Sequence, residues 1–218
     1  MTLTSQLRAS VDNIWRRIFR HPFVVELYNG TLPMEKFKYY IIQDYNYLVT
    51  MYKCLSLIAA KSEPEIAEKA LEIAYLDAST EMENYRELIG KLGLSMDDVL
   101  STEPAPTNEA YMNFLLKTCA LHPFIEGLTA ILPCFWSYME IAQVNQELLR
   151  GNGVELYRSW CEVYLSDDYI IMVENLRFLV DRYGVEYDFG RLEKLFRLGS
   201  RYEYLFWDMA YNMEKWEI

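Results

Sequence analysis

Apolar residues recur at intervals of three and four along almost the whole chain, and no run alternates convincingly between apolar and polar positions. The first spacing places apolar side chains on one face of an α-helix, whereas strict alternation is typical of a half-buried strand. The pattern therefore predicts an all-α protein. The main expected helices span about residues 5–20, 22–30, 33–61, 62–93, 108–120, 124–150, 154–165, 167–183 and 191–216.

Glycine, proline and capping residues mark the ends of these helices. Gly30 is placed where a C-terminal cap is expected, and Pro33 is placed in the first turn of the next helix. Residues 62–65 have the spacing of a capping box. The one clear loop, residues 101–107, is too short to be a flexible linker between domains. We therefore expect residues 1–218 to form a single domain built from a bundle of long antiparallel helices.

Composition and charge narrow the function classes. The chain has 32 acidic and 21 basic residues, a net charge of −11, and it lacks the basic cluster that releases counterions from nucleic acid. Nucleic acid and membrane surfaces are therefore not expected as partners. The N-terminus does not have the pattern of a secretory signal, and no apolar stretch approaches the ~20 residues of a membrane span. These features predict a cytoplasmic protein.

Tyrosine is the outlier in the composition, with 18 residues against 9 glycines. The phenols can line a polar cavity or pack amphipathic helices, and composition alone does not choose between these uses. The four cysteines contain no Cys-x-x-Cys redox or zinc motif. Each is expected to be a small buried hydrophobe, unless one of them is a reactive thiol.

The two histidines belong to a repeated His-Pro-Phe segment. His21 and His122 begin the two copies, which fit two helix breaks better than a duplicated half-bundle. A di-iron bundle needs Glu-x-x-His pairs, but Ile18 and Cys119 stand where the glutamates would be. We therefore expect no metal site of this kind. The number of histidines alone does not exclude that one of them is a haem ligand.

Residues 131–138 (Ile-Leu-Pro-Cys-Phe-Trp-Ser-Tyr) carry the first candidate chemistry. Pro133 lies inside a helical pattern, where it removes a backbone hydrogen bond and bends the helix. Cys134 follows directly, and Tyr138 lies one turn later on the same face. A thiol beside a phenol at a bend is a candidate nucleophile if its neighbours adjust its pKa. The structural alternative is a kink that serves packing only.

Two further clusters place an acid among aromatic residues. Asp44 and Tyr47 share one helix face, and Glu203 shares another with Phe206 and Trp207. Burial would raise the pKa of such an acid towards the range used in acid–base catalysis. The alternative for each is an ordinary carboxylate on a helix surface.

Segments that match the sequence pattern of a known family extend over nearly the whole chain. They are residues 21–23, 30–33, 37–40, 43–44, 47–48, 132–134, 136, 138, 140, 160, 164, 202–207, 209–211 and 216. Leu-Pro-Cys and Tyr-Glu-Tyr-x-Phe-Trp are specific when they occur together in this order. In these segments the chain resembles the TenA proteins, also called thiaminase II or aminopyrimidine aminohydrolases, and in particular their cysteine-containing branch.

The resemblance implies a haem-oxygenase-like helical bundle, usually a homotetramer, that uses no haem or other cofactor. It implies hydrolysis of small 4-amino-2-methylpyrimidines at their 5-methylene group. The leaving group is an amine in degraded thiamine and the thiazolium in thiamine itself. The product, hydroxymethylpyrimidine, serves thiamine salvage.

The resemblance also assigns roles to residues of this chain. Cys134 matches the nucleophile and Glu203 the acid/base. Asp44 matches the carboxylate that pairs with the ring nitrogen and the 4-amino group, and Tyr164 matches a phenol at the opposite ring edge. The other expected pocket residues are Tyr47, Tyr111, Tyr138 and Phe206.

One position departs from the pattern, because Tyr85 stands where several relatives carry histidine. Two other functions are alternatives. A non-catalytic pyrimidine-binding or regulatory protein could keep the same residues. A haem- or metal-using relative on the same fold is the other, and the missing Glu-x-x-His pairs together with Cys134 and Glu203 count against it. No motif marks the part of the pocket that holds the leaving group. The sequence therefore does not rank thiamine against its degradation products or their phosphates.

Overall fold

The computed structural model describes residues 1–217, except for the side chain of Thr80. Helices make up most of this part of the chain and no strand occurs in it, which confirms the prediction of an all-α protein. The elements in chain order are α1 (Leu3–Ser10), α2 (Asp12–Phe19), α3 (Pro22–Asn29), α4 (Met34–Ala59), α5 (Pro64–Leu76), the π-helix η1 (Asp77–Glu81), α6 (Met82–Lys91), α7 (Met96–Ser101), α8 (Pro106–Leu121), α9 (Phe124–Arg150), α10 (Glu155–Glu162), the 3₁₀-helix η2 (Val163–Leu165), α11 (Asp167–Tyr183) and α12 (Phe189–Asn212).

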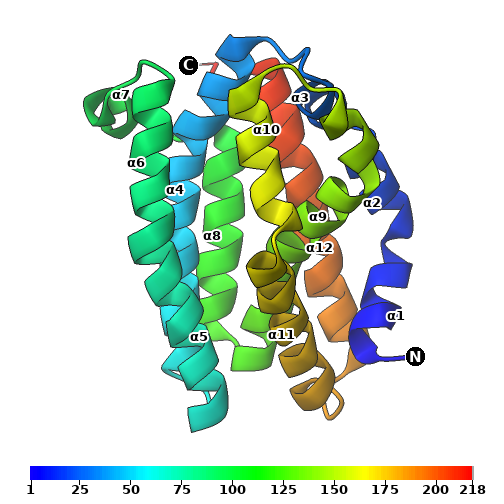
Figure 1. Cartoon of the computed structure of the whole chain (residues 1–218). Helices are drawn as coiled ribbons and strands as arrows, with labels where there is room; N and C mark the ends of the chain where they lie inside the picture. The colour runs from blue at the N-terminus through cyan, green and yellow to red at the C-terminus, as the bar shows by residue number, and fades with distance from the viewer. Residues whose placement is uncertain (218) are drawn as a thin grey trace.

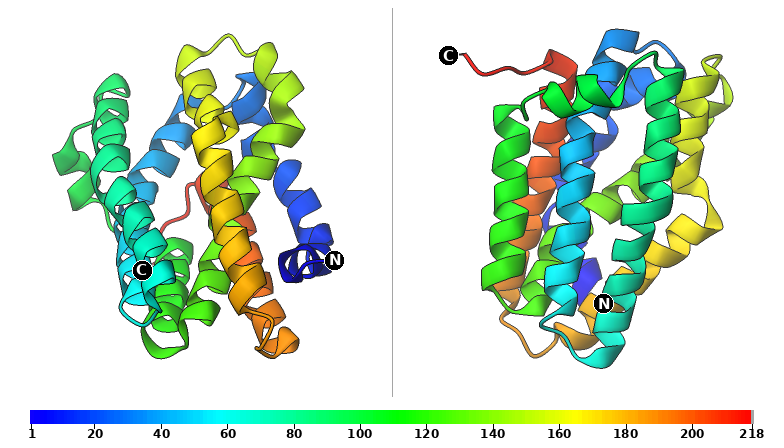
Figure 2. Two further views of the ribbon diagram at one scale, coloured as in Figure 1. Left: turned by 60° about the horizontal axis from the view of Figure 1, so that its bottom comes forward. Right: turned by 90° about the vertical axis from the view of Figure 1, so that its left-hand side faces the viewer.

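Four long helices, α4, α8, α9 and α12, contact one another in the middle of the bundle (Figure 1). The segment α5–η1–α6 forms a nearly continuous rod beside α4, and α10, η2 and α11 pack against α9 (Figure 2). On another side, α1, α2 and α3 pack against α12, and α2 and α3 also contact α9. The buried apolar side chains of all these layers form one core.

Two expectations about the helices in the first part of the chain are wrong. The predicted helix over residues 5–20 is two helices, because the chain bends at Val11 (φ −119°, ψ 13°). Val11 is fully buried, and the bend keeps both α1 and α2 against α12. The capping box predicted at residues 62–65 does not form, because the Ser62 hydroxyl donates to the carbonyl of Ile58 at 2.6 Å. Helix α5 begins instead at Pro64, in the first turn that suits proline.

Gly30 confirms the expected C-terminal cap. It ends α3 with φ at 82°, a left-handed conformation that glycine adopts without steric cost. An added Cβ would lie 2.5 Å from Oδ1 of Asn152. The Asn152 amide donates to the carbonyls of Leu27 and Tyr28. These two hydrogen bonds pair carbonyl groups that the end of the helix leaves without a donor.

Helices α9 and α12 lie very close together beside the proline of α9. A Cβ built on Gly199 would lie 2.8 Å from the carbonyl oxygen of Ala130 and 3.0 Å from Cγ of Pro133. Only a residue without a side chain fits between these atoms. Cys134 follows Pro133 directly, and Glu203 lies one turn after Gly199, so the close approach brings these two residues towards each other.

The C-terminal residues close the end of α8. Helix α12 ends at Asn212 rather than extending to residue 216 as predicted, and Met213 takes a left-handed conformation (φ 49°). The Glu214 carboxylate then accepts hydrogen bonds from the backbone N–H and the hydroxyl of Thr107, at 2.9 and 3.0 Å. Because Ala105 at the N-cap position of α8 has no side-chain acceptor, Glu214 supplies the carboxylate that a helix N-terminus favours.

Candidate active site

A cavity of about 760 Å³ lies between the α5–η1–α6 rod and the layer formed by α10, η2 and α11. Helices α4 and α9 contribute its other walls. The wall combines aromatic rings with carboxyl groups and one thiol. Five of the residues predicted from the sequence line it: Asp44, Tyr47, Cys134, Tyr138 and Tyr164.

The Cys134 thiol enters this cavity from α9, directly after Pro133. Burial is the main cause that raises its pKa, and the negative charge of Glu203 raises it further. The Tyr47 hydroxyl lies near the thiol and lowers the pKa of Cys134. The geometry of this contact is too poor for a hydrogen bond, so the Tyr47 hydroxyl has no hydrogen-bond partner among the described groups. The thiol is therefore protonated and needs a base when it attacks.

Glu203 lies behind Cys134 and does not line the cavity. Only 2% of it is exposed, and its Oε1 accepts a 2.5 Å hydrogen bond from the hydroxyl of Tyr111. Burial raises the pKa of Glu203 to about 7, while Tyr111 and Ser137 lower it. The Ser137 hydroxyl lies near the Glu203 carboxyl, but the two groups do not have the geometry of a hydrogen bond. A carboxyl with a pKa near neutrality can both accept and donate a proton.

Asp44 reaches the cavity from α4 and receives no hydrogen bond or ion pair from the described residues. Its pKa is raised by burial first and then by the charges of Glu81 and Glu203. A carboxyl in this state is costly to leave unpaired. It is therefore suited to pair with polar atoms of a ligand.

Aromatic rings connect the predicted residues. The hydroxyls of Tyr138 and Tyr40 lie 2.7 Å apart, and the rings of Tyr138 and Tyr164 have centroids 4.9 Å apart. Tyr47 contacts Tyr111 and Phe206, with centroids at 5.1 and 5.5 Å. Tyr111 and Phe206 do not line the cavity. Together with Glu203, they form a layer that supports the cavity wall from behind.

Sequence reasoning missed several residues of the wall. Asp77 and Glu81 both line the cavity from η1, and Tyr40, Trp160 and Tyr169 add aromatic surface. A π-helix has a wider turn than an α-helix and is frequent at functional sites. Nothing in the sequence marks this change of turn. In the sequence, Asp77 and Glu81 cannot be told from two acids on the exposed face of an ordinary α-helix.

Tyr85, whose role the resemblance did not supply, is buried and lines the same cavity. Its hydroxyl donates to the carbonyl of Ile41 at 2.7 Å, and its ring packs against Tyr45 at 5.7 Å between centroids. The hydroxyl therefore ties α6 to α4 beside Asp44.

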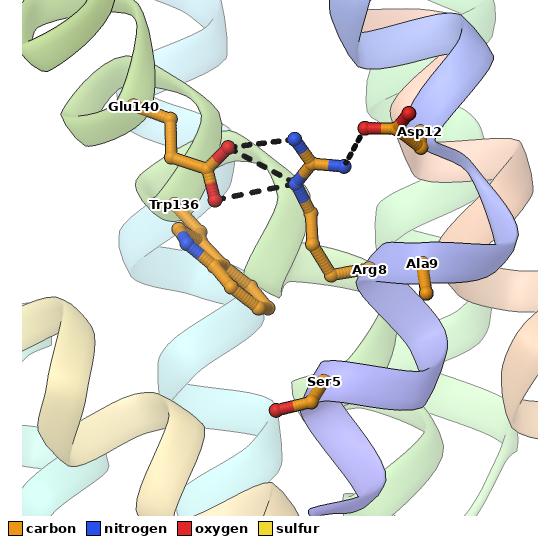
Figure 3. Close-up of a pocket in the computed structure, with 6 residues that line it drawn as sticks. All are labelled: Ser5, Arg8, Ala9, Asp12, Trp136 and Glu140. Atoms are coloured by element: carbon orange, nitrogen blue, oxygen red, sulfur yellow. Dashed lines mark hydrogen bonds and ion pairs between the residues drawn. The ribbon is translucent and has the colours of Figure 1, made fainter. Parts of the chain in front are cut away.

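A second, shallow pocket lies between α1 and α9 (Figure 3). Two atoms of the Arg8 guanidinium donate to Glu140, at 2.7–3.2 Å, and a third donates to Asp12 at 3.2 Å. Arg8 also lies over the ring of Trp15, 4.3 Å from its centroid. Because these charges are already paired, the pocket is explained by an ion-pair network that joins the two helices.

The two histidines lie away from the large cavity. His21 caps α3 by accepting from the backbone N–H of Phe23, at 3.2 Å, and His122 pairs with Glu126 at 2.8 Å. In the described part of the chain, no group of three or more His, Cys, Asp or Glu side chains is arranged to hold a metal ion. Nor does any described helix have the length and apolar content that crossing a membrane requires.

Comparison with known proteins gives one family along the chain. The model of the TENA/THI-4/PQQC family matches residues 8–213. A protein of Halalkalibacterium halodurans named aminopyrimidine aminohydrolase is 28% identical over 220 residues, which cover 99% of this chain and 98% of that protein. A Bacillus subtilis protein of the same name is 31% identical over 221 residues, covering 99% of this chain and 92% of that protein.

Solved structures agree with this match. A TenA homologue from P. horikoshii OT3 is 46% identical, with a TM-score of 0.94 over 97% of this chain and 99% of that one. A domain from Shewanella denitrificans OS217, described as having a heme oxygenase-like fold, gives a TM-score of 0.79 over 96% of this chain and 92% of that one. It is only 15% identical, so it shows the fold alone. The expected haem-oxygenase-like bundle is confirmed.

Proposed function

The chain belongs to the TENA/THI-4/PQQC family, and we propose that it is an aminopyrimidine aminohydrolase of thiamine salvage. Its substrates are 4-amino-2-methylpyrimidines with a leaving group on the 5-methylene, and its product is hydroxymethylpyrimidine. Relatives that share nearly the full length carry this activity in their names. The observation that carries the proposal is that a thiol and an unpaired carboxyl, Cys134 and Asp44, face one aromatic cavity.

Asp44 binds the pyrimidine in this proposal. A carboxyl group can accept from the 4-amino group, which orients the ring. It can also hydrogen-bond or protonate the adjacent ring nitrogen, and this second contact favours negative charge entering the ring. Tyr164 provides a phenol for the opposite ring edge. The rings of Tyr47 and Tyr138 pack against the flat substrate and exclude water. Phe206 and Tyr111 hold Tyr47 in place from behind.

Cys134 and Glu203 carry out the chemistry. As the thiol sulfur adds to an electron-poor ring carbon, Glu203 accepts the thiol proton. Electrons from the ring then expel the substituent on the 5-methylene. Because Glu203 lies behind the cavity wall, its proton reaches the departing amine through a water molecule beside Cys134. A second water adds to the exocyclic methylene, and the proton that it loses returns to Glu203 along the same path. The sulfur then leaves the ring and recovers a proton from Glu203, so the enzyme ends in its starting state.

Incubation with two substrates tests the proposal. Purified protein is given 4-amino-5-aminomethyl-2-methylpyrimidine or thiamine, and hydroxymethylpyrimidine is quantified by chromatography. The expected result is turnover that falls by at least about 100-fold in Cys134→Ser. Cys161→Ala is the matched control, because Cys161 is buried against Tyr28, away from the cavity. Binding without turnover would contradict the hydrolase and favour a pyrimidine-binding protein. Near-normal hydrolysis by Cys134→Ser would contradict the covalent route.

The proposal extends to the assembly and location of the protein. We propose a single-domain chain that assembles as a homotetramer in the cytoplasm. Exposed apolar side chains on α5 and α11 support contacts between copies, among them Leu71, Tyr75 and Phe178. The four free cysteines fit a reducing compartment. Light scattering of the purified protein measures the number of copies, and a monomeric mass would contradict the tetramer.

A further inference from the structure

The part of the cavity wall formed by η1 carries two carboxyl groups that the proposed mechanism does not use. Asp77 and Glu81 are half-buried and line the cavity. No described residue donates a hydrogen bond or forms an ion pair with either side chain. Burial raises the pKa of both, and the charge of Glu81 helps to raise the pKa of Asp77 to about 8. These acids therefore lack the partner that a buried carboxylate needs.

Acidic residues also outnumber basic ones in the cavity wall as a whole. Six acidic residues and two lysines line the cavity. Lys69 is already paired with Glu72, at 3.0 Å, so that Lys91 is the only cation left among the described lining residues, and its side chain is exposed. A cation in this wall lowers the raised pKa values of Asp77 and Glu81 and pairs with their charged forms, whereas a phosphate meets only charges of its own sign.

An unpaired hydroxyl in the same wall independently indicates a ligand. Tyr47 is 94% buried, since its exposed fraction is 6%, and its hydroxyl has no hydrogen-bond partner among the described groups. Leaving such a group without a partner is unfavourable. Tyr47 lines the cavity together with Asp44 and Cys134. Unpaired polar groups therefore occur in two parts of one cavity: Asp44 and Tyr47 where the ring is proposed to bind, and Asp77 and Glu81 on η1.

Asp77 lies close to the reacting group as well. In its charged form it raises the pKa of Cys134, and Glu81 in its charged form raises the pKa of Asp44. The two acids of η1 therefore lie within electrostatic range of both groups that hold and attack the ring. A substituent that projects from a ring bound by Asp44 and Cys134 has these acids as its neighbours.

We propose that Asp77 and Glu81 form a subsite for a positively charged substituent on the pyrimidine 5-methylene, either an ammonium or a thiazolium group. The subsite selects cationic substrates and rejects phosphorylated pyrimidines. This inference rests on the proposed function, because it concerns the leaving group of that reaction. It assigns substrate choice to a segment that differs from the ring-binding residues.

The same subsite favours release of the product. For the amine substrate, the balanced reaction converts the ammonium form and water into the hydroxymethyl product and an ammonium ion. The covalent step breaks the methylene–nitrogen bond and forms a methylene–oxygen bond. Because the product is neutral, it loses the attraction to Asp77 and Glu81 that the substrate had, so substrate binding is stronger than product binding.

Calorimetric binding measurements at pH 7 test the subsite. The probes are 4-amino-5-aminomethyl-2-methylpyrimidine, the neutral hydroxymethyl product and the phosphate ester of that product. The wild type is expected to bind the amine about 10-fold more tightly than the neutral product and the ester more weakly than both. In the double variant Asp77→Asn/Glu81→Gln, the preference for the amine falls to about 3-fold or less, whereas binding of the neutral product stays unchanged.

Glu83→Gln is the matched control, because it removes one charge from the exposed side of α6, outside the cavity wall. It is expected to keep the preference of the wild type. Equal losses for all three probes in the double variant, or an unchanged preference, would overturn the subsite. Tight binding of the phosphate ester by the wild type would overturn it too. The double variant removes repulsion between buried acids, so its Tm is expected to be no lower than that of the wild type.

Hydrolysis by the wild type, measured in parallel, separates this inference from the proposed function. Selective binding of the amine without hydrolysis supports the subsite and contradicts the proposed function. Hydrolysis with an unchanged preference in the double variant overturns the subsite alone.

Discussion

The Tyr111 hydroxyl, on α8, donates a 2.5 Å hydrogen bond to Oε1 of Glu203, on α12. This bond stabilises the charged form of a carboxyl whose pKa is otherwise raised by burial. The balance of the two effects leaves the pKa of Glu203 at about 7. The proton transfers assigned to Glu203 therefore depend on a tyrosine that does not reach the cavity itself.

Replacing this tyrosine is expected to shift the pH dependence of the reaction. Tyr111→Phe removes the hydrogen bond that lowers the pKa of Glu203, so the bend in kcat/KM near pH 7 moves to higher pH by roughly one unit. The measurement is kcat/KM for the aminomethyl substrate between pH 5 and 10. Tyr202→Phe is the control, because Tyr202 stacks on Tyr111 at 4.9 Å and has no described bond to Glu203. A bend that stays in place or moves to lower pH would contradict the assignment.

The contact between Gly199 and Pro133 predicts a change in both stability and rate. Gly199→Ala places a methyl group 2.8 Å from the Ala130 carbonyl, so α12 must move away from α9. The free energy of unfolding is expected to fall by about 1–3 kcal/mol. We expect kcat to fall more than KM changes, because Glu203 moves relative to Cys134.

Gly90→Ala is the matched control for this substitution. Gly90 is also helical, and an added Cβ meets nothing within 4 Å. Alanine is expected to raise the free energy of unfolding there by about 0.5–1 kcal/mol, with kcat unchanged. Denaturant unfolding and steady-state kinetics measure both effects. If Gly199→Ala were as stabilising as Gly90→Ala, the proposed constraint on α12 would be wrong.

Asp77 predicts how stability depends on pH. Its pKa rises from the ordinary value of 3.8 to about 8 in the folded protein, so between these values the folded state keeps a proton that the unfolded chain has lost. The contribution of Asp77 to stability is present below pH 3.8 and is lost as pH rises through 8. Asp77→Asn is expected to remove this loss, so that the variant is more stable than the wild type at pH 8.5.

Thermal unfolding at pH 5.5 and 8.5 measures this difference. Glu83→Gln, which removes an exposed acid near the same segment, is expected to keep the pH dependence of the wild type. A variant Asp77→Asn that loses as much stability as the wild type between the two pH values would refute the prediction.

Glu214 predicts a stability effect that is separate from catalysis. Glu214→Ala removes the carboxylate that accepts from Thr107 at the start of α8. The free energy of unfolding is expected to fall by about 1 kcal/mol, while kcat and KM stay unchanged because Glu214 lies outside the cavity wall. Urea unfolding gives the first value and the hydrolysis assay the others. A loss of activity without a loss of stability would show that the contact has another role.

The sequence predicted those parts of the fold that follow from local chemistry. Periodic apolar positions gave the long helices, and Gly30 ended α3 as expected. The bend at Val11 was not predictable, because no glycine or proline marks it. It follows from the packing of α1 and α2 against α12. The Ser62 hydroxyl had two acceptable uses, and the carbonyl of Ile58 was the one that formed.

The candidate site was predictable where a motif names a residue. Cys134 and Asp44 line one cavity, and the expected acid, Glu203, lies behind the thiol. The layering of Tyr111 and Phe206 behind Tyr47 was not predictable, because spacing along one helix does not specify which neighbouring helix covers it. Asp77 and Glu81 were missed for a different reason, since the π-helical turn that carries them depends on the packing of the rod beside α4.

The order in which the chain is made has a consequence for α12. This helix is made after all the helices that it packs against, which are α1, α2, α3, α4, α8 and α9 (Figure 1). Until residues 189–212 emerge, the core-facing side chains of those helices have no partner at the centre of the bundle. The bundle therefore closes only after α12 has left the ribosome, and chains that stop before it expose apolar surface to chaperones and proteases. Since Glu203 lies on the same helix, incomplete chains also lack the acid of the site.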